Sequence, residues 1–301
     1  MRAPDAPLMW GCVRRSDRPG AAFVALISAG FLLAVPARGE TSAPVAPARV
    51  VSMNLCTDQL ALALADPGQI VSLSHFATDP NMSVRWKQAE EYPANYGRAE
   101  EISILHPDLV LADTWSNPDT IAMLKTLGLR VEQLPPGTSL PEIRARITTM
   151  GALLGHPDRA AQMLAGFDAR LAAIKRPAPG LRAAVIGPSG YGYGPRTLEG
   201  QILAMAGFDN VVSGPGLNWG GRLPLEDLVM DRPDLVIMGG SQGKMGTSRA
   251  QAVLDHPVLR DLPTVRGLRD ARWTCGGPAM LGAVADLAAL GREVEQDKAT
   301  Q

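Results

Sequence analysis

The chain has 301 residues, of which 46% are hydrophobic and 20% charged, so it is long enough for two domains and too apolar to be disordered. Its formal net charge is -1, and no block of lysines or arginines occurs in the body of the chain, which argues against nucleic-acid binding. Mean hydropathy is +0.02. The one long uncharged apolar run, residues 21–35, is shorter than the roughly 20 residues of a membrane-spanning helix, so a polytopic membrane protein is excluded.

The first 39 residues have the pattern of a secretory signal peptide. Arg14, Arg15 and Arg18 precede the apolar run, and small residues follow it at positions 35–39. A buried N-terminal helix or a membrane anchor is the alternative, but the run is short and comes early. We therefore predict export, with cleavage near residues 37–39, and a soluble mature protein.

Strand and helix patterns alternate along the first half of the mature chain. Short apolar runs predict strands at 49–53, 70–73, 108–112 and 129–134, and amphipathic runs predict helices at 56–65, 99–105 and 118–127. Such alternation is typical of a mainly parallel sheet with helices on both faces. We predict an N-terminal α/β lobe over residues 48–138.

Residues 139–176 carry only a helical pattern, interrupted at Gly155-His156-Pro157. The alternating pattern then returns, with strands at 182–186 and 234–238 and helices at 197–206, 224–231 and 278–294. The sequence therefore predicts a C-terminal α/β lobe over residues 181–297. A long helical connection, residues 139–176, joins the two lobes.

An internal repeat supports two similar lobes. Residues 100–112 read EEISILHPDLVLA and residues 226–238 read EDLVMDRPDLVIM. In both, acidic residues suit the start of a short helix, a proline prevents its continuation, and an apolar strand follows. We interpret the two segments as the same helix-strand unit, one in each lobe.

Enzyme motifs are incomplete. Residues 187–191 (GPSGY) resemble a nucleophile elbow, but Tyr191 stands where the second glycine belongs. No phosphate-binding loop occurs, and three of the four histidines precede prolines, which leaves His75 in a candidate functional loop. The sequence therefore predicts neither an enzyme nor a histidine metal cluster, with an exported hydrolase as the alternative.

Two cysteines, Cys56 and Cys275, remain once Cys12 leaves with the predicted signal peptide. They are far apart in sequence, and neither belongs to a Cys-x-x-Cys motif. We expect two free or buried thiols. The alternative is a disulfide that tethers the lobes, which requires Cα atoms within about 7 Å.

Loops hold most aromatic residues of the mature chain. In parallel sheets, ligands bind beyond the carboxyl ends of the strands, so these rings predict a cleft for a flat or apolar ligand between the lobes. The alternative is that some rings pack the loops onto the core. The loop aromatics are Phe76, Tyr96, Trp115, Tyr191, Tyr193, Trp219 and Trp273.

The order of these blocks resembles the periplasmic substrate-binding proteins of ABC importers for cobalamin and ferric siderophores. The resemblance rests on RVVSMN and IVSLS, on residues 97–112, on the helical connection, and on residues 191–207 and 220–238. It implies a non-enzymatic periplasmic protein without a cofactor or bound metal, in which Glu100 and Glu226 dock onto arginines of the permease. The implied ligand-binding residues are Asn54, Phe76, Asp79, Tyr96, Trp115, Tyr191, Trp219, Arg222 and Trp273.

The expected ligand is bulky and nearly neutral, because Arg196 and Arg222 are balanced by Asp79 and Asp113 in the predicted cleft loops. Cobalamin and a hydroxamate-type ferric siderophore both fit. A heme or metal-ion carrier on the same scaffold is the alternative, with His75, Tyr96 or Tyr191 as ligands. We expect a monomer that binds the small ligand and a membrane permease, and no nucleic acid.

Overall fold

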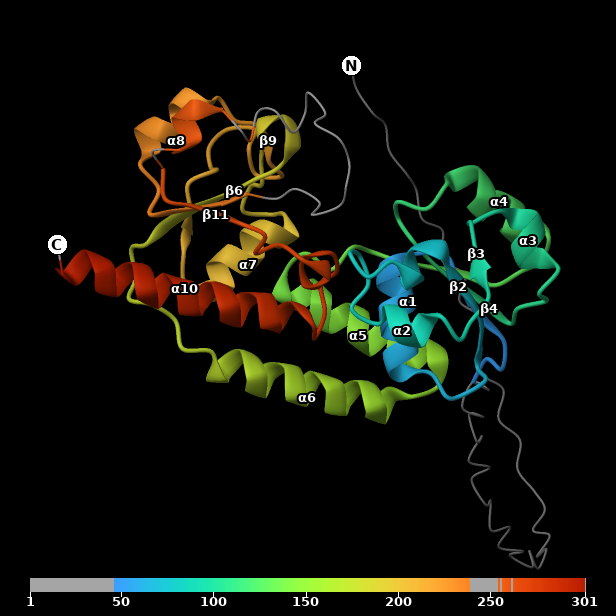
Figure 1. Cartoon of the computed structure of the whole chain (residues 1–301). Helices are drawn as coiled ribbons and strands as arrows, with labels where there is room; N and C mark the ends of the chain where they lie inside the picture. Colours follow the sequence, from blue (N-terminus) through green and yellow to red (C-terminus); the bar gives the residue numbers. More distant parts are fainter. Residues whose placement is uncertain (1–45, 239–253, 255, 261, 301) are drawn as a thin grey trace, which may run out of the picture. The chain divides into compact units, whose positions relative to one another are not determined.

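Two β-sheets, one from each half of the chain, organise the protein (Figure 1). The structure is a computed structural model that describes residues 46–238, 254, 256–260 and 262–300. The predicted signal peptide lies outside the described residues. Among the helices in the described ranges, none is both long and apolar enough to cross a membrane.

The first sheet is parallel throughout and has the strand order β3-β2-β1-β4-β5. The four predicted strands are confirmed with small changes at their ends, and the two-residue strand β3 was not predicted. The strands are β1 (Val50–Ser52), β2 (Ile70–Ser74), β3 (Ala94–Asn95), β4 (Leu109–Asp113) and β5 (Val131–Leu134).

Helices cover both faces of this sheet because its apolar residues alternate between two cores. Val50 packs in the core that contains helix α1 (Leu55–Leu64), whereas Val51 packs with helices α3 (Ala99–Ser103) and α4 (Pro118–Thr126). A short helix, α2 (Trp86–Ala89), completes the lobe. The predicted doubly covered parallel sheet is therefore confirmed.

The helical connection consists of two helices, α5 (Leu140–Leu154) and α6 (Pro157–Ala173). Gly155 ends α5 in the left-handed conformation, with φ 81°, at the interruption that the sequence predicts. The helices pack closely where Gly151 faces Ala160, since a Cβ on Gly151 would lie 2.3 Å from that of Ala160.

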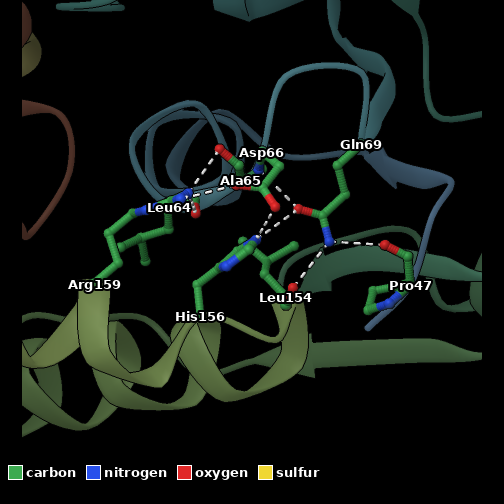
Figure 2. Close-up of polar contacts among 8 residues, drawn as sticks. All are labelled: Pro47, Leu64, Ala65, Asp66, Gln69, Leu154, His156 and Arg159. Atoms are coloured by element: carbon green, nitrogen blue, oxygen red, sulfur yellow. Dashed lines mark hydrogen bonds and ion pairs between the residues drawn. The ribbon is translucent and has the colours of Figure 1, made fainter. Parts of the chain in front are cut away.

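A polar cluster attaches this connection to the end of α1 (Figure 2). The guanidinium of Arg159 donates to the carbonyl oxygens of Leu64 and Ala65 and pairs with Asp66 at 2.8 Å. His156 Nε2 lies 3.2 Å from the Asp66 carboxylate, and the side-chain amide of Gln69 donates to the carbonyl oxygens of Pro47 and Leu154. The cluster therefore satisfies backbone carbonyls at the ends of both α1 and α5.

The second sheet has the order β11-β10-β6-β7-β9, with β8 paired to β6. Its β6–β10, β10–β11 and β6–β8 pairs are parallel, whereas β7 pairs antiparallel with both β6 and β9. The predicted mainly parallel sheet is thus confirmed, with one strand, β7, running antiparallel to its two neighbours. The strands are β6 (Arg182–Ile186), β7 (Tyr191–Gly192), β8 (Asp209–Asn210), β9 (Gly221–Arg222), β10 (Leu235–Met238) and β11 (Thr264–Arg266).

Helices also lie on both faces of the second sheet. Figure 1 shows α7 (Leu198–Ala206) beside the long C-terminal helix α10 (Met280–Thr300), and these two helices pack together. Helix α8 (Leu225–Asp231) covers the other face, where Leu228 packs with Val236.

Cys56 and Cys275 form a disulfide, with their Cα atoms 5.4 Å apart. The expectation of two free thiols is therefore wrong, and the alternative of a bridge is correct. The bond joins the start of α1 to the segment before α10. The neighbouring Gly276 allows this approach, because a Cβ there would lie 1.9 Å from the carbonyl oxygen of Gly137.

Candidate ligand-binding site

The carboxyl ends of the first sheet carry most of the predicted N-terminal site residues. Asn54 follows β1, Phe76 follows β2, Tyr96 follows β3 and Trp115 follows β4. Because these strands are parallel, their carboxyl ends meet at one edge of the sheet. The topology therefore gathers residues that lie up to 61 positions apart in sequence.

Phe76 and Tyr96 form an aromatic group with the neighbouring His75, and we call these three residues the N-terminal cluster. The His75 ring stacks on Tyr96 with centroids 4.7 Å apart and lies 3.8 Å from Phe76. Phe76 and Tyr96 are exposed. Trp115 is 80% exposed, and its backbone N–H donates to the Asp113 carboxylate, which fixes the turn that carries it. These rings present apolar area to a partner from outside the lobe.

A buried carboxyl group supports the N-terminal cluster from beneath. Asp58 accepts hydrogen bonds from the backbone N–H and the hydroxyl of Ser74, the residue before His75. Burial raises the pKa of Asp58 to about 7, although hydrogen bonds from Ser52 and Ser74 oppose that shift. Asp58 could not be recognised from the sequence, because an aspartate inside a predicted helix has the pattern of an ordinary surface acid.

The predicted polar ligand contacts Asn54 and Asp79, and the cleft-loop residue Asp113, already have structural roles. The Asn54 side chain caps α1 by accepting from the Cys56 N–H. The Asp79 carboxylate accepts two hydrogen bonds from Asn81 at 2.8 and 3.1 Å. The Asp113 carboxylate is buried and accepts from Trp115 and Ser116. These carboxylates therefore shape turns.

The C-terminal lobe carries a second aromatic group, which we call the C-terminal cluster: Tyr191, Tyr193, Trp219 and Arg196. The Tyr191 hydroxyl donates to the carbonyl oxygen of Trp219 at 2.8 Å, and the two tyrosine rings meet edge to face at 5.2 Å. The Arg196 guanidinium lies 4.9 Å from the centre of the Trp219 ring. Trp219 and Tyr191 are exposed, so this lobe also presents aromatic area.

An ion pair holds the C-terminal cluster from within. Arg269 pairs with Glu199 at 2.7 Å, and its guanidinium lies 4.8 Å from the centre of the Tyr193 ring. Burial raises the pKa of Glu199, although the charge of Arg269 opposes the shift. Arg222, a predicted ligand contact, is exposed on β9 opposite Tyr191.

Trp273, unlike Trp115 and Trp219, is not at the surface. Its side chain is 2% exposed and belongs to the main hydrophobic core, so it offers no ring face to a ligand. The prediction placed it in the cleft because it lies in a glycine-rich segment. That segment forms a short 3-10 turn, Ala271–Trp273, which directs the ring inward, so Trp273 is left out of the candidate site.

The segment that resembles a nucleophile elbow has a different geometry. Ser189 lies in a 3-10 turn, Pro188–Gly190, which leads into strand β7. A nucleophile elbow leads from a strand into a helix. The structure therefore removes the motif on which the hydrolase alternative rested.

Comparisons with known proteins identify the family. Residues 50–269 match the family model described as periplasmic binding protein. A cobalamin-binding protein of Halobacterium salinarum is 30% identical over 222 residues, which cover 71% of this chain and 60% of that protein's length. The ferric enterobactin-binding periplasmic protein FepB of Escherichia coli is 24% identical over 258 residues, covering 76% of this chain and 79% of that protein.

Solved structures agree with this match. The periplasmic heme-binding protein BhuT, solved with two hemes, superposes with a TM-score of 0.67 and 25% identity, covering 82% of this chain and 98% of that one. The family resemblance seen in the sequence is confirmed. The chain belongs to the periplasmic binding protein family.

Proposed function

We propose that the protein is the substrate-binding component of an ABC importer and captures a bulky, flat-faced ligand of the cobalamin or ferric hydroxamate siderophore type. The proposal rests on one observation above all: exposed aromatic side chains stand at both the N-terminal and the C-terminal cluster. Burying a ring face against a ligand contributes about 1 to 3 kcal/mol. Rings from both lobes would supply such contacts on two sides of the ligand.

The charges of the C-terminal cluster favour a ligand with peripheral oxygen acceptors. Arg196 is held over Trp219, and Arg222 is exposed, whereas the carboxylates of Asp79 and Asp113 are committed to turns. Guanidinium groups donate to amide and carboxylate oxygens. Cobalamin, with its rim of carboxamides, suits this arrangement, and the relative from Halobacterium salinarum carries that ligand in its name.

Heme is the second candidate. The His75 ring stacks on Tyr96, both at strand ends, and imidazole and phenolate are both ligands of heme iron. His75 Nδ1 is buried and has no hydrogen-bond partner among the described residues. The similarity to BhuT points to the same ligand class.

A ligand panel tests the proposal. Calorimetric titration of the mature protein with cyanocobalamin, ferrichrome and hemin should give tight one-to-one binding of one compound. Tight binding of a triply anionic ferric catecholate alone would overturn the prediction that the ligand is nearly neutral. Failure of every compound would overturn the function. A hemin complex is recognised by a Soret band that changes in Tyr96→Phe or His75→Ala.

Delivery to a membrane permease completes the proposal. Glu100 and Glu226 are exposed near the starts of α3 and α8, at equivalent places in the repeat. Two carboxylates can each meet an arginine of the permease through paired hydrogen bonds. Glu100→Ala with Glu226→Ala should abolish uptake and leave ligand affinity and folding intact. Normal transport by that double variant would refute the docking role, and lost ligand binding would place these residues in the ligand site.

We also propose that the protein acts outside the inner membrane and performs no covalent chemistry. The name of its family and the predicted signal peptide at residues 1–39 support this location. N-terminal sequencing of protein recovered from the periplasm should find a start just after residues 37–39. An uncleaved N-terminus on that material would contradict the predicted signal peptide.

A further inference from the structure

The two segments of the internal repeat have the same structure. Over residues 100–112 and 226–238, side-chain burial falls in the same class at eleven of thirteen positions. His106 and Arg232, each before a buried proline, both have φ 46°. Asp108 and Asp234 each accept a backbone N–H at the start of the neighbouring strand, from Arg49 and Arg182. The repeat is therefore a duplicated structural unit.

Each copy exposes one large apolar side chain at the same place. Ile104 is 72% exposed and Met230 is 81% exposed. Each follows its glutamate, Glu100 or Glu226, by four residues, so the apolar and acidic side chains share one helix face. The residue midway between them, Ile102 or Leu228, is fully buried and holds the opposite face against the sheet.

This pairing is not a consequence of core packing. Single exposed hydrophobic residues are common on protein surfaces, but equivalent ones in two diverged copies are not explained by that background. Neither the Glu100 nor the Glu226 carboxylate takes part in an ion pair or hydrogen bond within the described part of the chain. Both acid-apolar pairs therefore face outward, and their carboxylates are available to a partner.

The C-terminal copy also borders a pocket of about 670 Å³. Its wall includes Leu223, Pro224, Leu225 and Val229, with Glu226 and Met230 among the lining residues. An apolar side chain of a partner would fit there beside a cation that meets Glu226. Arg222 and His256 also line this pocket. At Glu226 and Met230 the surface is complementary to a partner that presents a basic residue next to an apolar one.

We propose that Ile104 and Met230 are the apolar halves of two equivalent permease contacts, each completed by Glu100 or Glu226. The inference rests on the proposed function, because the partner is the membrane permease of the importer. In such a contact the ion pair orients the encounter and weakens with salt, whereas the apolar side chain holds the complex by excluding water at any salt concentration. Duplication of the contact suits a partner with two equivalent docking sites.

The test uses Ile104→Ser with Met230→Ser in source cells that lack the wild-type gene. The radiolabelled compound is cyanocobalamin, or ferrichrome or hemin if the ligand panel selects one of those. Its uptake should fall at least ten-fold, with ligand affinity and melting temperature unchanged. Ile104→Leu with Met230→Leu should keep uptake within about two-fold of wild type. Met123→Ser with Leu127→Ser is the matched control, because it also replaces two exposed apolar side chains. Met123 lies in α4 and is 50% exposed, and Leu127 follows the end of α4 and is 52% exposed. That control should transport normally.

Co-sedimentation with inner-membrane vesicles of the source cells separates the two halves of each contact. The serine variant should bind less at both low and high salt, whereas Glu100→Ala with Glu226→Ala should lose mainly the salt-sensitive part. Wild-type uptake by the serine variant, with uptake abolished in the glutamate variant, would overturn this inference and leave the proposed function intact. Failure of the wild-type protein to bind any ligand of the panel would overturn the proposed function itself.

Discussion

The tryptophans show how much depends on the position of a single residue. Trp115 and Trp219 are exposed beside strand ends, whereas Trp273 is buried, although the sequence around all three looks like loop. The strand pattern shows which residues follow a parallel strand, and Trp115 was predicted as a site residue on that ground. Trp273 is buried in the same core as residues far away in sequence, such as Val50 and Ile143, and no local pattern reports that arrangement.

These tryptophans should respond differently to truncation. Trp115→Ala and Trp219→Ala should each weaken ligand binding roughly ten-fold or more, because a ring contact is lost, with little change in stability. Trp273→Ala should instead lower the free energy of unfolding by about 3 to 5 kcal/mol, because it leaves a cavity in the core. Ligand titration and urea unfolding of all three variants distinguish the two classes. Unchanged affinity in both surface variants would show that the ligand binds elsewhere.

Asp58 should make the stability depend on pH. Its pKa is raised from 3.8 to about 7 in the folded state, so the folded protein binds more protons than the unfolded chain between those values. The free energy of unfolding should therefore fall as pH rises from about 4 to about 7, by up to roughly 4 kcal/mol. Asp58→Asn, which stays neutral, should flatten this slope. A slope in urea-unfolding experiments that persists unchanged in Asp58→Asn would contradict the assignment.

At the scale of elements, hydrophobic periodicity predicted the central strands and the longer helices but not the short strands. β6 and β10 are four or more residues long with apolar side chains on both faces, which gives a pattern that can be read locally. β3, β7, β8 and β9 are two residues each and are strands only through their pairing partners. Gly155 and Pro157 mark the break between α5 and α6, so that boundary could be predicted.

The junction of α1 with α6 offers a test at this scale. Arg159→Met should lower the melting temperature by several degrees at neutral pH, because the Asp66 carboxylate and two backbone carbonyls lose their donor. The hydrogen bond from Arg159 holds the pKa of Asp66 below its ordinary value. The stabilisation from that carboxylate is therefore present above pH 4 and is lost as pH falls through the folded-state pKa.

The difference between wild type and Arg159→Met should therefore narrow at acidic pH without vanishing, since the carbonyl contacts remain. Arg144→Met is the matched control, because Arg144 forms an exposed ion pair with Asp168 between α5 and α6. Thermal melts at neutral and acidic pH follow both variants. If the melting temperature falls no further in Arg159→Met than in the control, the junction of α1 with α6 contributes little to stability.

For the whole molecule, the block order of the sequence predicted the two-sheet architecture and the family, but not the covalent link. Cys56 and Cys275 are 219 positions apart, and only the complete fold brings their Cα atoms to 5.4 Å. Their separation in sequence favoured free thiols, because no local pattern shows that the two loops meet. In the structure Cys56 lies in the first turn of α1 and Cys275 precedes α10, where the adjacent Gly276 lies against Gly137 of the other half of the chain.

The disulfide gives a prediction at this scale. Cys56→Ser with Cys275→Ser should lower the free energy of unfolding by about 2 to 5 kcal/mol, because the bond closes a long loop in the unfolded chain. Thiol counting on denatured, unreduced mature protein from the periplasm should find no reactive thiol. Two reactive thiols in that material would show that the bond does not form.

One ligand should lie between aromatic residues from both lobes. The crystal structure of the mature protein saturated with the tightest compound of the panel measures this directly. We expect a ligand in contact with Trp115 or the N-terminal cluster on one side and with Trp219 and Tyr191 on the other. A ligand that contacts only one lobe, or that binds away from both clusters, would show that the ligand does not lie between the aromatic residues of the two lobes.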